Sequence, residues 1–375
     1  LARGFNKITA LKIEKKQFPK RHNVIKTKLR IGFVSGDFKD HPVGYFCENL
    51  IKNLDSKIFE TFAFSNSNII TEQTSVLKSH MERWHSIYGV SDDIVAELIH
   101  DQKLDVLIDL SGHTAKNRLP LFAYRPAPLQ VTWLGFYAST GLDEMDYILG
   151  DRFVTPLNER KNFSEKILNF PDSYICFSPP KLNLEIVSTP ALENGFVTFG
   201  CFNKASKISQ DLVGTWSKIL NGVPESKIFF QGEGYSGEKG GIITQLFADN
   251  GIEPSRISLS GRRSREEMLT SYRQVDIALD TFPYPGGTTT CEALWMGVPT
   301  ITKKGTNFLS RVGESIAHNS DHSEMCSLDE NGYIIKAIEL SNNREILNIN
   351  RLSRREKIIK SPLFDGKLFA QNFEK

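Results

Sequence analysis

The hydrophobic residues of the first half of the chain fall into short runs with longer mixed stretches between them. The runs are too short for helices and are rich in valine, isoleucine and phenylalanine, which favours buried parallel strands. The mixed stretches are predicted to be helical. This alternation is typical of a doubly wound α/β domain. Strands are predicted at 30–35, 59–65, 105–112, 129–136 and 147–151, and helices at 43–54, 72–83 and 92–101.

The same alternation restarts near residue 196, after an irregular stretch at 181–195. The restart predicts a second α/β domain, since 375 residues exceed what one hydrophobic core usually serves. We therefore expect a lead-in at 1–28, an N-terminal domain at 29–180, a linker at 181–195 and a C-terminal domain at 196–375. Its last helices are expected to pack back toward the first domain. Strands are predicted at 196–202, 227–232, 256–261, 276–280 and 299–303, and helices at 210–220, 241–250, 264–274, from about 289, and from 307 onward.

Composition and charge narrow the class of protein. Hydrophobic residues make up 40% and charged residues 24% of the chain, as in ordinary globular proteins. The 46 basic and 44 acidic residues nearly balance, which argues against a general nucleic-acid-binding protein. No apolar run reaches the ~18 residues that span a bilayer, and no signal peptide is recognisable, so we expect a cytoplasmic protein without a membrane span. The five cysteines lack metal-ligand spacing and are expected to be buried, reduced thiols.

The densest turn chemistry lies at 281–290, TFPYPGGTTT, between a predicted strand and a predicted helix. Gly286 and Gly287 allow close approach of a ligand, and the first helical turn offers unpaired N–H groups and the positive end of a dipole. Three hydroxyls add donors, those of Thr288, Thr289 and Thr290. The stretch predicts a phosphate cradle. The structural alternative is a plain Gly-Gly turn followed by a capping box, Thr289-x-x-Glu292.

A second polar loop, at 200–209, also lies between a predicted strand and a predicted helix. It contains Lys204 and Lys207, both placed where an anion is within reach. A loop lysine is commonly only solvated, so this loop alone is a weak indication of a binding site.

Two histidines follow predicted strands in the first half. His41 directly precedes a helix that starts with Pro42, and His113 follows the strand at 105–112. A helix N-terminus disfavours the imidazolium form, so a neutral His41 can serve as a base near pH 7. The alternative for each is an ordinary histidine in a surface loop.

Four stretches follow one another along the chain: RIGFVSGDFKDHPVGYF, DVLIDLSGHTAKNRLPLFAYRPAPLQVTWLGFYASTG, FGCFNKASKIS and DIALDTFPYPGGTTTCEALWMGVPTIT. In this order they resemble the catalytic region of the O-linked N-acetylglucosamine transferases and their SPINDLY-like relatives. The likeness covers about 29–319 and, weakly, 361–375. It implies a GT-B architecture, in which two Rossmann-like domains face each other across a donor cleft and helices end the chain. It also implies inversion at the anomeric carbon without a metal or other cofactor.

The resemblance assigns roles to particular residues. Lys207 matches the lysine that contacts the donor diphosphate, and Glu292 matches an acid that holds the ribose hydroxyls. His41 matches a histidine close to the chemistry and is, with Lys207, the expected catalytic residue. The residues expected on the donor side are Lys207, Gly286, Gly287, Thr288, Thr289, Thr290, Glu292 and Arg265. Those expected on the sugar or acceptor side are His113, Gly135 and Arg311.

The function implied is transfer of N-acetylglucosamine from UDP-GlcNAc onto serine or threonine hydroxyls of proteins. One position departs from the animal members, because Met268 stands where they carry a histidine that helps hold the uracil. Methionine can pack against a base but cannot donate a hydrogen bond. The sequence of the glycine-rich stretch, DTFPYPGGTTTCE, is more similar to the SPINDLY-like branch of the family. Some members of that branch use GDP-fucose. Protein O-fucosylation is therefore the alternative.

Other readings of the same architecture stay open. A sugar-nucleotide epimerase shares the two-domain shape, and a non-catalytic sugar-nucleotide-binding module would keep the cleft without turnover. The family usually carries tetratricopeptide repeats ahead of this region. No 34-residue repeat is recognisable before Arg30.

Overall fold

The computed structural model describes residues 2–12, 18 and 27–375, which form two compact units. The first unit contains the described residues up to Ser178 together with Asp365–Lys375, and the second is Pro179–Phe364. These bounds differ from the expected ones at two places. The stretch 181–195 belongs to the second unit, because its apolar side chains, such as Ala191, are buried there. The last helix belongs to the first unit.

The first unit is built on a seven-stranded parallel sheet with the order β3-β2-β1-β4-β5-β6-β7. The predicted strands are present. The structure adds the edge strands β3 and β7, whose side chains are largely solvent-accessible and lack an apolar run. The strands are β1 (Leu29–Ser35), β2 (Phe59–Ser65), β3 (Arg83–Ser86), β4 (Val106–Asp109), β5 (Leu129–Thr132), β6 (Tyr147–Asp151) and β7 (Lys166–Phe170).

In the first unit, helices connect β1 to β2, β2 to β3, β3 to β4 and β4 to β5. The helix predicted at 72–83 ends early, at Ser79, because the chain turns there and then enters β3. Part of the lead-in forms α1, and most of the rest of that predicted segment, residues 13–17 and 19–26, lies outside the described residues. The helices are α1 (Ala2–Lys12), α2 (Pro42–Asn53), α3 (Glu72–Ser79), α4 (Asp92–Asp101), α5 (Leu119–Phe122) and α14 (Gly366–Glu374).

The second unit is built on a six-stranded parallel sheet with the order β10-β9-β8-β11-β12-β13. Only the short edge strand β13 was not predicted. Every other predicted strand is present, trimmed by a residue or two at its ends. The strands are β8 (Thr198–Cys201), β9 (Lys227–Gln231), β10 (Ile257–Ser260), β11 (Ile277–Leu279), β12 (Thr300–Lys303) and β13 (Cys326–Ser327).

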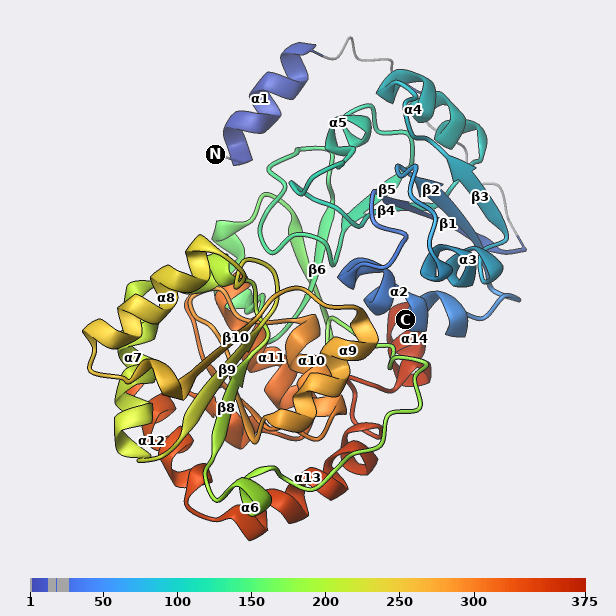
Figure 1. The fold of residues 1–375 in the computed structure, drawn as a ribbon. Helices are drawn as coiled ribbons and strands as arrows, with labels where there is room; N and C mark the ends of the chain where they lie inside the picture. Colours follow the sequence, from blue (N-terminus) through green and yellow to red (C-terminus); the bar gives the residue numbers. More distant parts are fainter. Residues whose placement is uncertain (1, 13–17, 19–26) are drawn as a thin grey trace. The chain divides into compact units, whose positions relative to one another are not determined.

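Helices cover both faces of the second sheet. Figure 1 shows α7 and α8 on one side of β8, β9 and β10, with α9 and α10 on the other. Two hydrophobic clusters fill these layers, one around Trp216 of α7 and one around Tyr272 at the end of α9. The helices are α6 (Ala191–Asn194), α7 (Gln210–Gly222), α8 (Glu238–Asp249), α9 (Arg265–Ser271), α10 (Thr288–Trp295), α11 (Val312–Asn319), α12 (Glu330–Ser341) and α13 (Arg344–Ile358).

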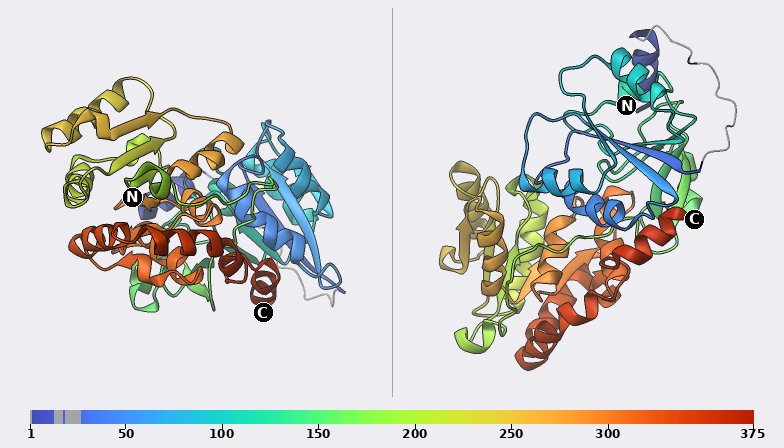
Figure 2. Two further views of the ribbon diagram at one scale, coloured as in Figure 1. Left: turned by 60° about the horizontal axis from the view of Figure 1, so that its bottom comes forward. Right: turned by 90° about the vertical axis from the view of Figure 1, so that its right-hand side faces the viewer.

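Helix α14 returns to the first unit and packs beside α2 (Figures 1 and 2). Phe369 on its buried face stacks against Phe170 with ring centroids 4.8 Å apart. At its end, the carboxylate of Glu374 accepts a hydrogen bond from the backbone N–H of Asp55. The return of the last helix thus rests on an amphipathic sequence, and its apolar face completes the core of the first unit.

All five cysteines are free thiols, four of them buried and Cys326 partly buried. Burial raises the pKa of the Cys47 thiol, which keeps it protonated. Among the described helices, none combines the length and apolar character needed to cross a bilayer.

Candidate active site

The candidate donor site lies in the second unit, where the strand order reverses between β8 and β11. In doubly wound sheets, ligands bind outside the carboxyl ends of the strands at such a point. The loop after β8 carries Lys207, and the loop after β11 carries Gly286 and leads into α10. The two predicted polar loops therefore come from neighbouring strands.

Lys207 is anchored across these two loops. Its Nζ donates to the backbone oxygen of Pro285 at 2.7 Å and to Oδ1 of Asn203 at 3.1 Å, and it lies 3.9 Å from the centre of the Tyr284 ring. Burial lowers the pKa of the Lys207 ammonium to about 8, against the opposing effect of the Asp280 carboxylate. The side chain is therefore a fixed, partly dehydrated cation at neutral pH.

Lys204, the other lysine of this loop, has a different environment. It is exposed, and its Nζ lies 2.9 Å from the equally exposed carboxylate of Glu233. Such surface pairs contribute little to stability. The two lysines of this loop therefore have different environments, and of the two only Lys207 is anchored to the glycine-rich loop.

The glycine-rich loop is held by a buried acid. Asp280 is 1% exposed, and its Oδ1 accepts a hydrogen bond from the backbone N–H of Gly286 at 2.6 Å. Its Oδ2 accepts from the hydroxyl of Thr302 on β12 at 2.9 Å. Burial raises the pKa of Asp280 to about 6, although these hydrogen bonds favour the charged form. A Cβ on Gly286 would lie 2.6 Å from the hydroxyl oxygens of Thr289 and Thr290, so this turn requires glycine.

Helix α10 begins at Thr288 with Gly287 as its N-cap, and no side chain caps it. The alternative of a capping box at Thr289 is therefore wrong, because Thr289 lies inside the first turn and its hydroxyl donates to Oδ1 of Asn203 at 3.3 Å. The backbone oxygen of Thr289 accepts from the Tyr272 hydroxyl at 2.9 Å. Thr288 and Thr289 are partly exposed. Thr290 is buried and lines a small internal pocket under the helix.

Two residues expected on the donor side meet in the next turn. Glu292 on α10 is 2% exposed, and its Oε1 lies 3.3 Å from Nε of Arg265, the first residue of α9. Burial raises the pKa of Glu292 to about 7, and the arginine opposes that shift. The pair therefore provides a carboxylate that gains or loses a proton near neutral pH.

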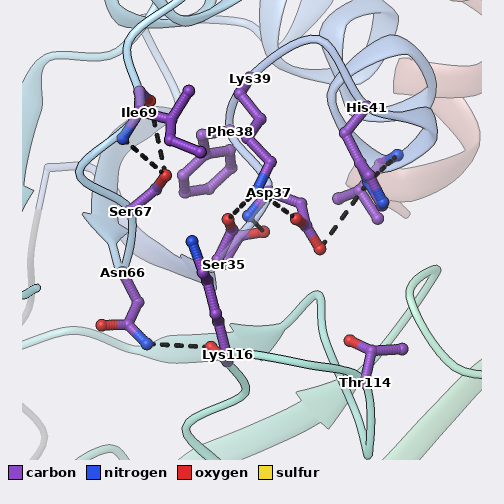
Figure 3. Close-up of polar contacts among 12 residues, drawn as sticks. Ser35, Asp37, Phe38, Lys39, His41, Asn66, Ser67, Ile69, Thr114 and Lys116 are labelled. Atoms are coloured by element: carbon purple, nitrogen blue, oxygen red, sulfur yellow. Dashed lines mark hydrogen bonds and ion pairs between the residues drawn. The ribbon is translucent and has the colours of Figure 1, made fainter.

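In the first unit, the corresponding reversal of strand order lies between β1 and β4. His41 caps α2 there, and its Nδ1 accepts from the backbone N–H of Val43 at 3.3 Å. The carboxylate of Asp37 lies 3.7 Å from the same nitrogen and also 3.0 Å from Nζ of Lys39 (Figure 3). In a neutral His41 whose Nδ1 accepts a hydrogen bond, Nε2 carries the hydrogen. The imidazole then presents a donor at Nε2 rather than a base.

The residues expected on the sugar or acceptor side lie in both units. Nε2 of His113 lies 2.7 Å from the backbone oxygen of Thr140, which requires a hydrogen on that nitrogen. Gly135 lies against the loop after β4, and a Cβ there would meet the backbone oxygen of Leu110 at 2.0 Å. Arg311, in the second unit, is 8% exposed and donates to the backbone oxygens at 305 and 306. Arg311 therefore holds its own loop.

The sequence reasoning missed two polar residues of the donor loops. Asp280 and Asn203 are both buried and connect the loops to each other. Asp280 could have been found, because it is the last residue of the predicted strand at 276–280 and precedes the glycine turn. Asn203 had no comparable signal.

The fold and these loops define a class of proteins, the GT-B glycosyltransferases. Anabaena HepE in complex with UDP-glucose aligns over 92% of this chain with a TM-score of 0.60 and 13% identity, a likeness of fold alone. A mutant of the Thermobaculum terrenum O-GlcNAc transferase aligns over 100% of this chain and 73% of its own, with a TM-score of 0.90 and 30% identity. The model of glycosyl transferase family 41 matches residues 2–178 and 178–373. The chain belongs to this family.

Two curated plant relatives are similar to nearly the whole of this chain. The probable UDP-N-acetylglucosamine–peptide N-acetylglucosaminyltransferase SPINDLY of Solanum lycopersicum is 35% identical over 356 residues, 92% of this chain and 38% of the relative. The Arabidopsis thaliana protein of the same description named SEC is 30% identical over 360 residues, 93% of this chain and 36% of the relative. The chain thus spans well under half the length of the relatives it matches.

Proposed function

We propose that the chain catalyses the transfer of a sugar from a nucleoside diphosphate donor onto a serine or threonine hydroxyl of a protein. The acceptor oxygen forms a bond to the anomeric carbon as the bond from that carbon to the diphosphate breaks, so the configuration inverts. The hydroxyl proton leaves to a base, and the nucleoside diphosphate leaves with the bonding electrons.

The observation that carries this proposal is the set of donors at the carboxyl ends of β8 and β11. The Lys207 ammonium, the Thr289 hydroxyl and the first turn of α10 all belong to these neighbouring loops. A leaving diphosphate gains negative charge in the transition state, and fixed positive partners lower the barrier most when they need not reorganise. Glu292 one turn further along α10 is our candidate for accepting hydrogen bonds from the ribose hydroxyls.

The donor that we propose is UDP-GlcNAc, the donor that the names of the SPINDLY and SEC relatives give. GDP-fucose is the second candidate, favoured by Met268. This side chain packs against the hydrophobic cluster around Tyr272 and has no hydrogen-bond donor for a base. A larger purine base can be held there by packing against Met268, without the histidine that helps hold uracil in the animal members.

The first unit supplies the candidate groups for the sugar and acceptor. His41 is proposed near the reacting atoms, with its Nε2–H directed to an oxygen of the substrate. As a base it would need the other tautomer, in which Nδ1–H turns from Val43 to the Asp37 carboxylate. The 3.7 Å separation of His41 Nδ1 from Asp37 makes that exchange a small movement.

The test is incubation of the protein with UDP-GlcNAc or GDP-fucose and a panel of test proteins. Release of UDP or GDP together with a mass increase on a test protein supports the transferase. Interconversion of the sugar nucleotide without release would instead indicate an epimerase, and binding without product a non-catalytic module. A thermal-shift panel of sugar nucleotides identifies the donor, because a ligand that binds only the native state raises the melting temperature.

A further inference from the structure

The side chain of Asn203 connects the parts of the candidate donor site. Asn203 follows β8 and is 6% exposed. Its Oδ1 accepts hydrogen bonds from Nζ of Lys207 at 3.1 Å and from the hydroxyl of Thr289 at 3.3 Å. Its Nδ2 donates to Oδ1 of Asp280 at 3.3 Å. One amide therefore contacts the β8 loop, the first turn of α10 and the end of β11.

The chemistry of the neighbours determines the orientation of this amide. An ammonium can only donate and an ionised carboxylate can only accept, so the reversed amide would face donor to donor and acceptor to acceptor. The backbone is held as well, because the buried Tyr235 hydroxyl donates to the carbonyl oxygen of Asn203 at 2.8 Å. Both the side-chain amide and the backbone carbonyl of Asn203 are thus held by hydrogen bonds.

We infer that Asn203 is a positioning residue that presents Lys207 and Thr289 together to the diphosphate of the donor. This inference rests on the proposed function. The Lys207 ammonium and the Thr289 hydroxyl both donate to Oδ1 of Asn203. A diphosphate that binds beside this oxygen can therefore contact both groups. Without Asn203, the ammonium of Lys207 would keep only its contacts to Pro285 and Tyr284, which both belong to the glycine-rich loop.

Substitutions at this position have distinguishable electrostatic effects. The groups facing Lys207 are the carboxylate of Asp280, the thiol of Cys201 and the ammonium of Lys204. Asn203→Asp adds a carboxylate within reach of Lys207, which raises the pKa of the lysine and competes with the diphosphate. Asn203→Leu keeps the volume but removes the acceptor, which lowers that pKa. A residue that only fills space would produce neither shift.

The experiment measures the affinity of the protein for UDP and for GDP by calorimetry between about pH 7 and pH 10, with melting curves. Both variants should bind the nucleotide that the wild type binds about tenfold or more weakly at pH 7.5. In Asn203→Asp the added carboxylate competes with the diphosphate for Lys207, and in Asn203→Leu the ammonium and the Thr289 hydroxyl lose their common acceptor. The alkaline fall in affinity should move to higher pH in Asn203→Asp and to lower pH in Asn203→Leu. The matched control Asn194→Asp, at an exposed site at the end of α6, should superimpose on the wild type.

The inference is overturned if both variants bind like the wild type, or if both weaken binding while the alkaline fall stays in place. Asn203→Asp keeps the shape of the side chain and decides the matter alone if Asn203→Leu does not fold. A wild-type protein that binds neither UDP nor GDP contradicts the proposed function and the positioning role with it. A wild type that binds while the variants show no effect contradicts only the positioning role.

Discussion

At the scale of single residues, the candidate donor site combines a partly buried ammonium and a buried carboxylate whose pKa values are shifted toward neutrality. Burial lowers the pKa of Lys207 to about 8 and raises that of Glu292 to about 7. Each group is stabilised in its neutral form by dehydration, and each is proposed to act in its charged form. Nucleotide binding should therefore be strongest in a narrow pH window, between the two values.

The acidic side of this window tests Glu292. As the pH falls through about 7, Glu292 takes up a proton and can no longer accept hydrogen bonds from both ribose hydroxyls. UDP affinity should therefore decline as the pH is lowered through about 7, and Glu292→Gln should flatten that decline. Pyrophosphate, which has no ribose, is the matched probe. A pyrophosphate profile that changes equally in Glu292→Gln would contradict the ribose assignment.

The alkaline side tests Lys207. The lysine loses its proton as the pH rises through about 8 in the free protein, and the neutral amine no longer compensates diphosphate charge. The ratio kcat/KM should thus fall above about pH 8, with the nucleotide-release assay as the measurement. A flat profile up to pH 10 would show that the charge of Lys207 does not matter.

At the scale of elements, hydrophobic periodicity was enough to predict nearly all the central strands, because a parallel strand buried on both faces must be apolar throughout. It failed at β3, β7 and β13, which are edge strands with mixed or very short sequences. For the site, the glycine turn and Lys207 were recognisable because they follow strands. Asp280 could have been recognised too, because it ends a predicted strand. Asn203 could not, because its importance lies in contacts between two loops distant in sequence.

The turn after β11 yields a prediction at this scale. Gly286→Ala places a methyl group 2.6 Å from the hydroxyl oxygens of Thr289 and Thr290, so the start of α10 must shift. UDP affinity should drop about tenfold or more, by loss of one or two hydrogen bonds to a charged ligand. The control is Gly241→Ala in α8, where a Cβ meets nothing within 4 Å. That variant should be neutral or up to about 1 kcal/mol more stable. Equal affinities in both variants would refute the cradle.

At the scale of the whole molecule, two parallel-sheet units each place loops at a reversal of strand order. The chain spans 38% of the length of the SPINDLY relative from Solanum lycopersicum. The proposed chemistry uses Lys207 and a helix N-terminus where other transferases use a divalent ion. Within the described residues there is no group of three or more histidine, cysteine, aspartate or glutamate side chains able to hold a metal.

Chelation tests whether the proposed transfer is independent of a metal ion. Transfer should continue at an unchanged rate in excess EDTA, because the leaving diphosphate is expected to be stabilised by protein groups alone. The measurement is nucleotide release before and after chelation. Activity that disappears with EDTA and returns with manganese or magnesium would contradict metal-independent transfer.

The central claim is that Lys207 stabilises the departing diphosphate, and nucleotide release by Lys207→Ala tests it most directly. The matched control is Lys204→Ala, three positions away, which loses only an exposed pair with Glu233. We expect Lys207→Ala to lose about 2.7–4 kcal/mol of transition-state stabilisation, roughly 100- to 1000-fold in rate. Its melting temperature should stay close to that of the wild type, and Lys204→Ala should keep its rate. A Lys207→Ala protein that retains more than about a third of the wild-type rate, a loss under ~1 kcal/mol, would contradict the claim.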